Sequence, residues 1–586
     1  MDILDILMAR ALNPDAQAET AAKAAKEAAL EAKADAETAS NVAQTLEDAI
    51  ERATNIPVIN ITNQNTNTAV SSTMQVQDNS GISSIMYKNY KQEGENEDGS
   101  MTQKAIKTYV QSAIDSIPQG GGQGGGSIDL GDDNAGKIVV VGDDGQPQSG
   151  TITEKSIIQA LINSGSYVVE GSYGLKINYA DKTFARDQDA AHVIDFSNQP
   201  IYNKIRRCLV DDNGEIISFY GDGIYEDDPS TGYQTMVYIP KFYYLRIPLE
   251  YNGSTLKQEE LFISATPQDG FKIHPAFINE DGEEVDYILF SAYESSAYST
   301  SNNSYVLNDS DVDFNTDKLA SIAGSKPLSG ANKEFNLENA EKMATNRGKG
   351  WHVNSFKAIS AIQMLAMIEY GSMNMQTAIN PGVSELNTGS TSVNSAVITG
   401  ATSSLGNASG RADTTTNIIN GNEYTYTEDG QCSVSYRGIE NIWGSMWSIV
   451  GGAQVRKSAT NNQFYVYVCK NLNYANGVYE PINVSLPLAS GWIGNFGYDE
   501  NFDWAFLPID ASSGNNKLPV GDYYWAPLAG DNVRNMRIGG YWGLKDSDGL
   551  FAYAFDHYYT SHRNNSNGRL MFVPIKNQIY YSNLQE

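Results

Sequence analysis

The sequence predicts a multidomain protein with an N-terminal α-helical coiled-coil stalk, small α/β neck modules and a large C-terminal α+β domain. Three observations lead to this prediction. At 586 residues the chain is too long for one hydrophobic core. An Ala-rich segment without Gly or Pro covers residues 15–53, and a Gly-rich linker covers residues 119–127. From about Tyr167 onward, aromatic residues become frequent and short strand-like runs alternate with turn residues.

The first element is the helical stalk, residues 1–54. Its Ala, Glu and Lys residues have high helix propensity. Val42, Leu46, Ala49 and Ala53 recur at spacings of 4, 3 and 4, the a/d pattern of a coiled coil. Because the Ala-rich seam upstream buries little area per residue, such a helix needs partner helices. We expect a parallel homo-oligomeric stalk, and a homotrimer because fibre proteins generally are trimers. One helix lying on a globular domain is the alternative.

The next elements connect the stalk to the large domain. Residues 55–127 are rich in Asn, Thr and Ser and end in the linker, which is flexible by composition. The neck module that follows, residues 128–166, has a strand-then-turn pattern at 136–145. A helix is expected at 153–164, with Thr153 as its N-cap.

The large domain is assigned to residues 167–586. Its one strongly helical stretch is 355–371, which carries a broad apolar face, and a shorter helix is expected at 336–347. Residues 387–429 contain little apolar sequence, so they are expected to form long exposed loops or irregular β structure. The remainder reads as short strands.

Bulk properties exclude several classes of function. The formal charge of −30 and the pI near 4.5 argue against nucleic-acid binding and against adhesion to an anionic membrane. No run approaches the roughly 18 apolar residues of a membrane span, and no basic region precedes the apolar start. The three cysteines, Cys208, Cys432 and Cys469, follow neither a disulfide framework nor a metal-ligand spacing. We therefore expect a soluble protein made in a reducing cytoplasm.

Two segments resemble a known fold family. The run from Tyr436 to Trp447 resembles the Y-R-G-x-E-N-x-W-G-N-x-W run of C-type-lectin-like domains of the formylglycine-generating-enzyme type. The closing segment is similar to the G-G-x-W, G-x-F and G-x-R pattern in variable proteins of diversity-generating retroelements, which include phage tropism determinants. The matching positions are Gly539, Gly540, Trp542, Gly549, Phe551, Gly568 and Arg569.

The similarity extends over about residues 167–576. Residues 202–208, 238–244 and 346–352 resemble tail proteins of phages and prophages of gut bacteria. The resemblance thus implies a C-type-lectin-like domain in a bacteriophage tail protein that binds a receptor on the host cell. It also implies that receptor contacts come from diversified positions between the fixed ones, including Gly543.

The segment from Tyr541 to Asn565 has the composition of a binding surface. Its Tyr, Trp and His residues are interleaved with Asp, Ser and Asn, as in antibody-like loops, whereas Trp542 and Phe551 are expected in the core. The residues that the resemblance assigns to receptor binding are Tyr541, Leu544, Lys545, Asp546, Asp548, Tyr553, Phe555, Asp556, His557, Tyr558, Tyr559, Ser561, His562 and Asn564.

No enzymatic centre, metal or cofactor is expected. The enzymatic branch of the resembled fold uses two redox-active cysteines in its C-terminal part, whereas Cys432 and Cys469 lie 37 residues apart and outside the closing segment. The calcium-dependent sugar motifs of lectins are absent, since Glu480-Pro481-Ile482 lacks the required amide. The Asp-rich segments 143–145 and 211–214 are expected to be hairpin turns.

The expected function is that of a phage tail receptor-binding protein that attaches the virion to a host surface protein or glycan. Its N-terminus would bind other tail or baseplate proteins. Two alternatives stay open. A tail-associated glycan hydrolase would need two carboxylates in an aromatic cleft, although the periodicity of a depolymerase β-helix is missing. A purely structural fibre is the other alternative.

Overall fold

The computed structural model describes residues 59–66, 69–76, 138–141, 147–150, 162 and 169–575, the last range with gaps at 253–254, 387–392, 475 and 513–518. The predicted coiled-coil stalk and the Gly-rich linker lie outside the described residues. So does the helix predicted at 153–164, apart from Ile162. The chain forms two compact units, Met1–Val168 and Val169–Glu586.

The described part of the first unit consists of two antiparallel hairpins. β1 (Ile59–Thr66) pairs with β2 (Ala69–Val76). β3 (Ile138–Val141) pairs with β4 (Pro147–Gly150), with Ile138 opposite Gly150. The strand predicted within residues 136–145 is confirmed as β3, whereas the predicted turn lies outside the described residues.

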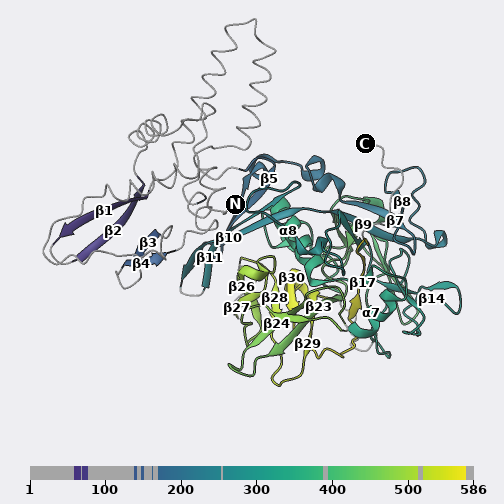
Figure 1. Ribbon diagram of the computed structural model, residues 1–586. Helices are drawn as coiled ribbons and strands as arrows, with labels where there is room; N and C mark the ends of the chain where they lie inside the picture. Colours follow the sequence, from purple (N-terminus) through teal and green to yellow (C-terminus); the bar gives the residue numbers. More distant parts are fainter. Residues whose placement is uncertain are drawn as a thin grey trace, which may run out of the picture. The chain divides into compact units, whose positions relative to one another are not determined.

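The second unit is mainly β-sheet (Figure 1). Within its described residues the α-helices are α7 (Leu337–Thr345), α8 (Phe356–Tyr370) and the single turn α9 (Met375–Ala378). The predicted α+β class therefore overstates the helix content of this unit. Most apolar runs of this unit are short and bounded by turn residues, so they pair as strands instead of completing helical turns.

Both predicted helices of this unit are confirmed, and their ends follow capping rules. The Ser355 hydroxyl accepts a hydrogen bond from the Ala358 amide (3.1 Å) at the start of α8, and the helix ends before Gly371. The Asn336 side chain caps α7 in the same way. The residues of α8 from Ala358 to Ile368 are all buried, because the helix packs between β5 and β23 of two different sheets. It is therefore the central helix of the core.

Two sheets carry the first half of this unit. The five-stranded sheet has the order β12 (Lys272–Ile273), β10 (Tyr243–Asn252), β11 (Thr255–Ser264), β5 (Ser172–Asn178) and β6 (Thr183–Gln188). The six-stranded sheet has the order β17 (Trp351–Val353), β32 (Leu570–Phe572), β13 (Tyr287–Ser291), β9 (Gln234–Pro240), β7 (Arg206–Val210) and β8 (Ile216–Phe219). β32, the last described strand, thus pairs with two strands from much earlier in the chain. Asp211–Gly214 forms the turn between β7 and β8, as predicted.

A nine-stranded sheet carries the second half. Its main path is β25 (Tyr479–Pro481), β24 (Phe464–Cys469), β23 (Trp447–Lys457), β29 (Arg534–Gly539), β30 (Gly549–Ala554), β28 (Tyr523–Trp525), β26 (Gly491–Phe496) and β27 (Pro508–Ser512). β31 (Ser566–Gly568) pairs with β23 in parallel. Figure 1 shows most of these strands together below α8.

Smaller sheets and turns complete the unit. The small sheets are β15 (Ser304–Val306) with β14 (Ser296–Ser299) and β16 (Lys318–Ala320), β18 (Gly410–Arg411) with β21 (Val434–Tyr436) and β22 (Ile439–Glu440), and the hairpin β19 (Thr415–Ile419) with β20 (Asn422–Tyr426). The 3₁₀ turns are η2 (Asp189–His192), η3 (Phe196–Asn198), η4 (Tyr202–Lys204), η5 (Pro229–Thr231), η6 (Pro275–Phe277), η7 (Ser403–Leu405), η8 (Glu500–Phe502) and η9 (Lys545–Ser547).

The polar stretch 387–429 is only partly exposed. Its described residues include the hairpin β19–β20, where Ile418 and Tyr424 are exposed. Ala396 and Val397 are fully buried, although the sequence predicted an exposed loop. Their burial results from packing against Val383, Leu386 and Trp542, residues distant in sequence that local composition does not reveal.

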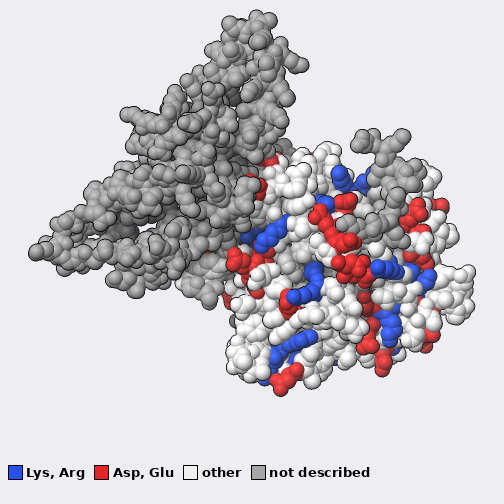
Figure 2. Space-filling model, viewed as in Figure 1, with Lys and Arg blue, Asp and Glu red and all other residues white. Residues whose placement is uncertain are grey.

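Charged side chains of both signs are interspersed over the face of the second unit seen in Figure 2. Among the described residues, none of the helices combines the length and the apolar character that a membrane crossing requires.

Candidate functional site

The two segments that carry the family resemblance meet in the fold. The Gly444 amide donates to the Gly539 carbonyl (3.0 Å), and the Trp542 amide donates to the Ser445 carbonyl (3.1 Å). The fully buried guanidinium of Arg569 donates to the Asn441 carbonyl (2.6 Å). The matched residues are therefore structural, and they hold the closing segment against the Tyr436–Trp447 run.

Two glycines of the fixed pattern leave space for buried carboxyl groups. A Cβ on Gly540 (φ +91°) would lie 1.7 Å from Oδ1 of Asp548, and a Cβ on Gly549 (φ +153°) would lie 2.1 Å from Oδ1 of Asp522. Asp548 accepts the Tyr541 amide (3.0 Å), and Asp522 accepts the Phe551 amide (2.7 Å). Asp548 thereby fixes the backbone just after β29, and Asp522 fixes the backbone within β30.

Burial raises the pKa of both carboxyls well above the ordinary value of aspartate. The charge of Asp522 raises the pKa of Asp548 further. Oδ1 of Asp522 and Oδ2 of Asp548 have no hydrogen-bond partner within the described part of the chain. Protonated carboxyls therefore fit this buried position better than a pair of charges.

Three predicted binding residues are not at the surface. Asp548, Tyr553 and Phe555 are 0% exposed, so the expectation that they are accessible is wrong. Tyr553 and Phe555 point into the main core, and the Tyr553 hydroxyl meets the amide of Gln363 on α8 (3.0 Å). The cause is the two-residue period of a strand, which places Ala552 and Ala554 on the opposite side. The strict alternation of large and small residues from 551 to 555 is the sequence pattern from which the burial of Tyr553 and Phe555 could have been predicted.

The predicted core positions are confirmed, since Phe551 is fully buried and Trp542 is 4% exposed. Trp542 belongs to a small cluster with Val383, Leu386 and Met446, beside the main core.

The other predicted binding residues reach the surface in two groups. In the first, Tyr541 and Leu544 are half-buried, whereas Lys545 and Asp546 are exposed. In the second, Tyr558 (44%) and His562 are exposed, and the half-buried members are Asp556, His557, Tyr559, Ser561 and Asn564. The second group is tied to other loops. Nδ1 of His562 lies 3.2 Å from the Gly330 carbonyl, and Asn564 donates to the Val393 carbonyl (2.8 Å).

The first group belongs to an aromatic surface that sequence reasoning missed. Its half-buried members are Trp492, Tyr523, Trp525, Tyr541 and Leu544, which we call the aromatic face. Trp525, Tyr541 and Leu544 pack on a buried base of Trp447, Ala552 and Ala554. The small alanines of β30 thus leave room for larger rings from the neighbouring strand β28 and from the loop after β29.

Strand pairing determines which rings face outward. Trp492 on β26 lies opposite Tyr523 on β28, and Trp525 lies beside Ala554 on β30. Tyr524 and Tyr553, which precede Trp525 and Ala554 and lie beside each other, point into the core on the other side of the sheet. The clustering of Tyr523, Tyr524 and Trp525 in sequence was a signal for this site.

The rings contact one another in edge-on and tilted geometries. Ring centroids are 5.3 Å apart for Trp492 and Tyr523, 4.6 Å for Tyr523 and Trp525, and 5.1 Å for Trp525 and Trp447. Two exposed leucines lie beyond the face, Leu488 (55%) in the loop before β26 and Leu528 (54%) in the loop after β28. A hydrogen bond from the Ala526 amide to the Ser490 hydroxyl connects these two loops. The face is therefore a set of mutually packed rings on one side of the nine-stranded sheet.

A polar cluster of the buried Arg537 with the half-buried Asp556 and His557 supports one edge of the face. The Arg537 guanidinium lies 5.3 Å from the Trp447 ring centroid, 2.7 Å from Oδ1 of Asp556 and 2.7 Å from Nδ1 of His557. Burial lowers the pKa of His557. Burial alone would raise the pKa of Asp556, but hydrogen bonding to His557 and the charge of Arg537 hold it below its ordinary value. Asp556 and His557 thus orient Arg537 under the face.

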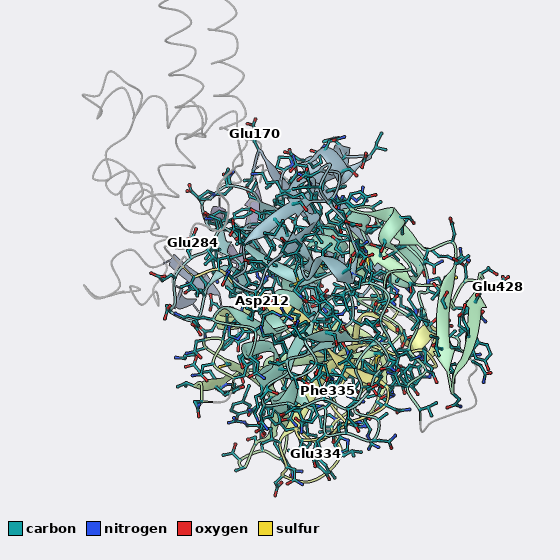
Figure 3. All side chains as sticks on the ribbon, turned by 90° about the vertical axis from the view of Figure 1, so that its right-hand side faces the viewer. Glu170, Asp212, Glu284, Glu334, Phe335 and Glu428 are labelled. Carbon is teal, nitrogen blue, oxygen red and sulfur yellow. The ribbon has the colours of Figure 1, made fainter. Side chains whose placement is uncertain are left out.

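A polar pocket lies next to the aromatic face. Its volume is about 220 Å³, and its lining residues are Asn374, Gln376, Thr377, Pro381, Ser384, Glu385, Asp429, Gly430, Gly521 and Asp546. The Lys545 amide donates to the Ser384 carbonyl (3.0 Å), and Gln376 donates to the Lys545 carbonyl (3.2 Å). The loop from Tyr541 to Asp548 therefore contributes both to the face and to the pocket. Figure 3 places Glu428, next to Asp429, at the periphery of the domain.

The chemistry of a metal centre or reactive thiol is not assembled in the part of the chain that the structure describes. Within those residues, His, Cys, Asp and Glu side chains form no group of three or more suited to a metal ion. Cys208, Cys432 and Cys469 are buried and unpaired, and burial raises the pKa of each thiol.

Comparison with solved structures finds similarity to three variants of a protein named Major Tropism Determinant. The U1, M1 and P3c variants share 11%, 11% and 10% sequence identity with this chain. The matches cover 70%, 70% and 69% of this chain and 73% of each variant, with TM-scores of 0.22, 0.21 and 0.22. Neither the protein-family models nor the curated proteins include a match.

Proposed function

We propose that this chain is a bacteriophage tail protein that attaches the virion to a receptor on the host cell, and that the aromatic face is its receptor-binding surface. The observation that carries the proposal is the set of half-exposed Trp and Tyr rings held on the nine-stranded sheet. Trp and Tyr dominate the energetics of protein recognition because they bury a large area at a low cost in conformational entropy.

The second unit is, in this proposal, a C-type-lectin-like domain of the formylglycine-generating-enzyme type. The contacts among the matched residues support it, since Arg569 binds the Asn441 carbonyl and Gly539 binds the Gly444 amide. Tyr541 and Leu544 then represent diversified positions within the face, and Lys545 and Asp546 represent diversified positions at its edge. Binding proceeds by surface complementarity without bond cleavage.

The complete protein is proposed to be a homotrimer in the virion tail, with its N-terminus bound to other tail or baseplate proteins. Three copies of the face would bind a cell with avidity, which can exceed the single-site affinity by about 10² to 10⁴. A surface of moderate affinity therefore suffices for attachment.

The test is binding of the full chain to host cells after Trp525→Ala or Tyr523→Ala. Because truncation of a central aromatic anchor costs about 2 kcal/mol or more, we expect binding to weaken at least about 30-fold. The matched control is Tyr251→Ala, which removes an exposed tyrosine from β10 of the five-stranded sheet. It should bind like the unchanged protein.

Equal binding by all variants would contradict the assignment of the face. The same substitutions in the phage separate attachment from a purely structural role. Particles that assemble but fail to adsorb support receptor binding, whereas particles that fail to assemble support a structural fibre.

A further inference from the structure

The aromatic face and the polar pocket are two parts of one surface. Leu544 packs on the base of the face, and Asp546 lines the pocket. Two residues along an extended chain span at most about 7 Å, so the two sites are separated by less than the length of a small ligand. A ligand that reaches one site can therefore reach the other.

The face has the chemistry that stacks a sugar ring. A pyranose presents C–H groups on one side, and these pack against the electron-rich faces of Trp and Tyr. Its hydroxyl groups extend around the ring edge, where they need polar partners. A flat apolar protein segment could also cover the face, but it would make no use of the polar pocket beside it.

The pocket has the complementary polar chemistry. Glu385, Asp429 and Asp546 supply carboxylate oxygens for hydroxyl donors. Asn374 uses its Oδ1 to accept the Thr377 amide and offers its Nδ2 as a donor, whereas Gln376 donates its Nε2 to the Pro381 and Lys545 carbonyls and offers its Oε1 as an acceptor. Its volume of about 220 Å³ suits a single sugar ring. It is an open, polar site.

The charges around the pocket limit the kind of sugar. Three carboxylates line it, and the neighbouring Arg411 offsets the charge of only one of them, Asp429, through an ion pair (2.9 Å). Lys545 adjoins the rim. A sugar with a carboxylate, sulfate or phosphate group would meet like charge, which raises the free energy of binding. A neutral sugar avoids this repulsion.

We propose that the receptor is a neutral glycan, with one sugar unit stacked on the aromatic face and an adjoining unit hydrogen-bonded in the polar pocket. This inference rests on the receptor-binding function proposed above. It names the chemical class of the receptor and adds Glu385, Asp429 and Asp546 to the binding surface.

The first experiment measures binding of the full chain to host cells treated either with periodate, which cleaves the vicinal diols of sugars, or with protease. A glycan receptor predicts loss of binding after periodate and retention after protease. The reverse result would overturn the glycan assignment while leaving receptor binding intact. If Trp525→Ala binds cells as well as the unchanged protein, the assignment of the face as a receptor-binding surface fails. That result differs from the protease result, so failure of the glycan assignment and failure of the proposed function are distinguishable.

The second experiment uses polysaccharide extracted from the same cells and separated by anion exchange into neutral and acidic fractions. We expect the neutral fraction to compete with cell binding and the acidic fraction to have no effect. Competition by the acidic fraction alone would overturn the inference. Release of new reducing ends from either fraction would show a hydrolytic site and contradict binding without cleavage.

Variants of the pocket complete the test. Asp546→Asn and Asp429→Asn keep the size of each side chain but remove a charged acceptor, so we expect about tenfold weaker competition by the neutral fraction. The control is Asp286→Asn. Asp286 directly precedes β13, is exposed and forms an ion pair with Lys241, so its change should leave competition by the neutral fraction unchanged. Unchanged competition in both pocket variants would exclude the pocket from the site.

Discussion

At the scale of single residues, Asp522 and Asp548 stand out because they are fully buried beneath the loop that carries Tyr541. Asp548 was a predicted binding residue, yet its structural role is to accept the Tyr541 amide. The raised pKa of each carboxyl means that the folded protein holds protons that the unfolded chain releases near pH 4. Between that pH and the folded-state pKa, the free energy of unfolding therefore falls as the pH rises.

The variant Asp548→Asn tests this linkage. The amide cannot ionise, and its oxygen can still accept the Tyr541 amide. We expect its melting temperature, relative to the unchanged protein, to rise as the pH increases from about 4 toward the folded-state pKa of Asp548. Each proton retained by the folded state corresponds to about 1.4 kcal/mol per pH unit. Parallel curves for Asp548→Asn and the unchanged protein would contradict the assignment.

At the scale of elements, β30 separates the core from the binding surface. Phe551 and Tyr553 face the main core, whereas Ala552 and Ala554 form the base of the aromatic face. Gln363 of α8 is hydrogen-bonded to the Tyr553 hydroxyl and to the Leu550 carbonyl (3.0 Å each), so the central helix anchors this strand. The strand supports the site from behind and contributes no large ring to it.

Tyr553→Ala is accordingly expected to act on stability. Removing a fully buried ring leaves a cavity and costs about 3–5 kcal/mol of unfolding free energy, to be measured by urea denaturation. Tyr523→Ala, on the outward side of the neighbouring strand, should cost much less, because its ring is half-buried. A similar loss in the two variants would contradict the orientation of β28 and β30.

At the scale of the whole molecule, the proposed trimer depends on the a/d pattern near residue 46, outside the described residues. We expect the full chain to sediment at three times its mass of 63.9 kDa. Leu46→Asp places a charge in the seam and should convert the trimer to monomers. Glu47→Gln, which lies off the a/d positions, should leave the mass unchanged. A monomeric unchanged chain would contradict the stalk.

Local patterns in the sequence determined several elements before any contact was known. Helix α8 followed from its apolar face, the Ser355 cap and Gly371, and the β7–β8 turn followed from Asp211–Gly214. The core positions of Trp542 and Phe551 followed from the family resemblance. Such features depend on residues a few positions apart, so the sequence alone is sufficient.

Only the tertiary structure decided where the binding surface lies. Trp492, Tyr523 and Ala554 come together because β26, β28 and β30 are neighbours in the nine-stranded sheet. Pairing between strands distant in sequence sets that order, and the two-residue period then decides which rings are exposed. The abundance of aromatic residues after residue 540 could not show that Tyr553 and Phe555 support the core while earlier strands supply most of the face.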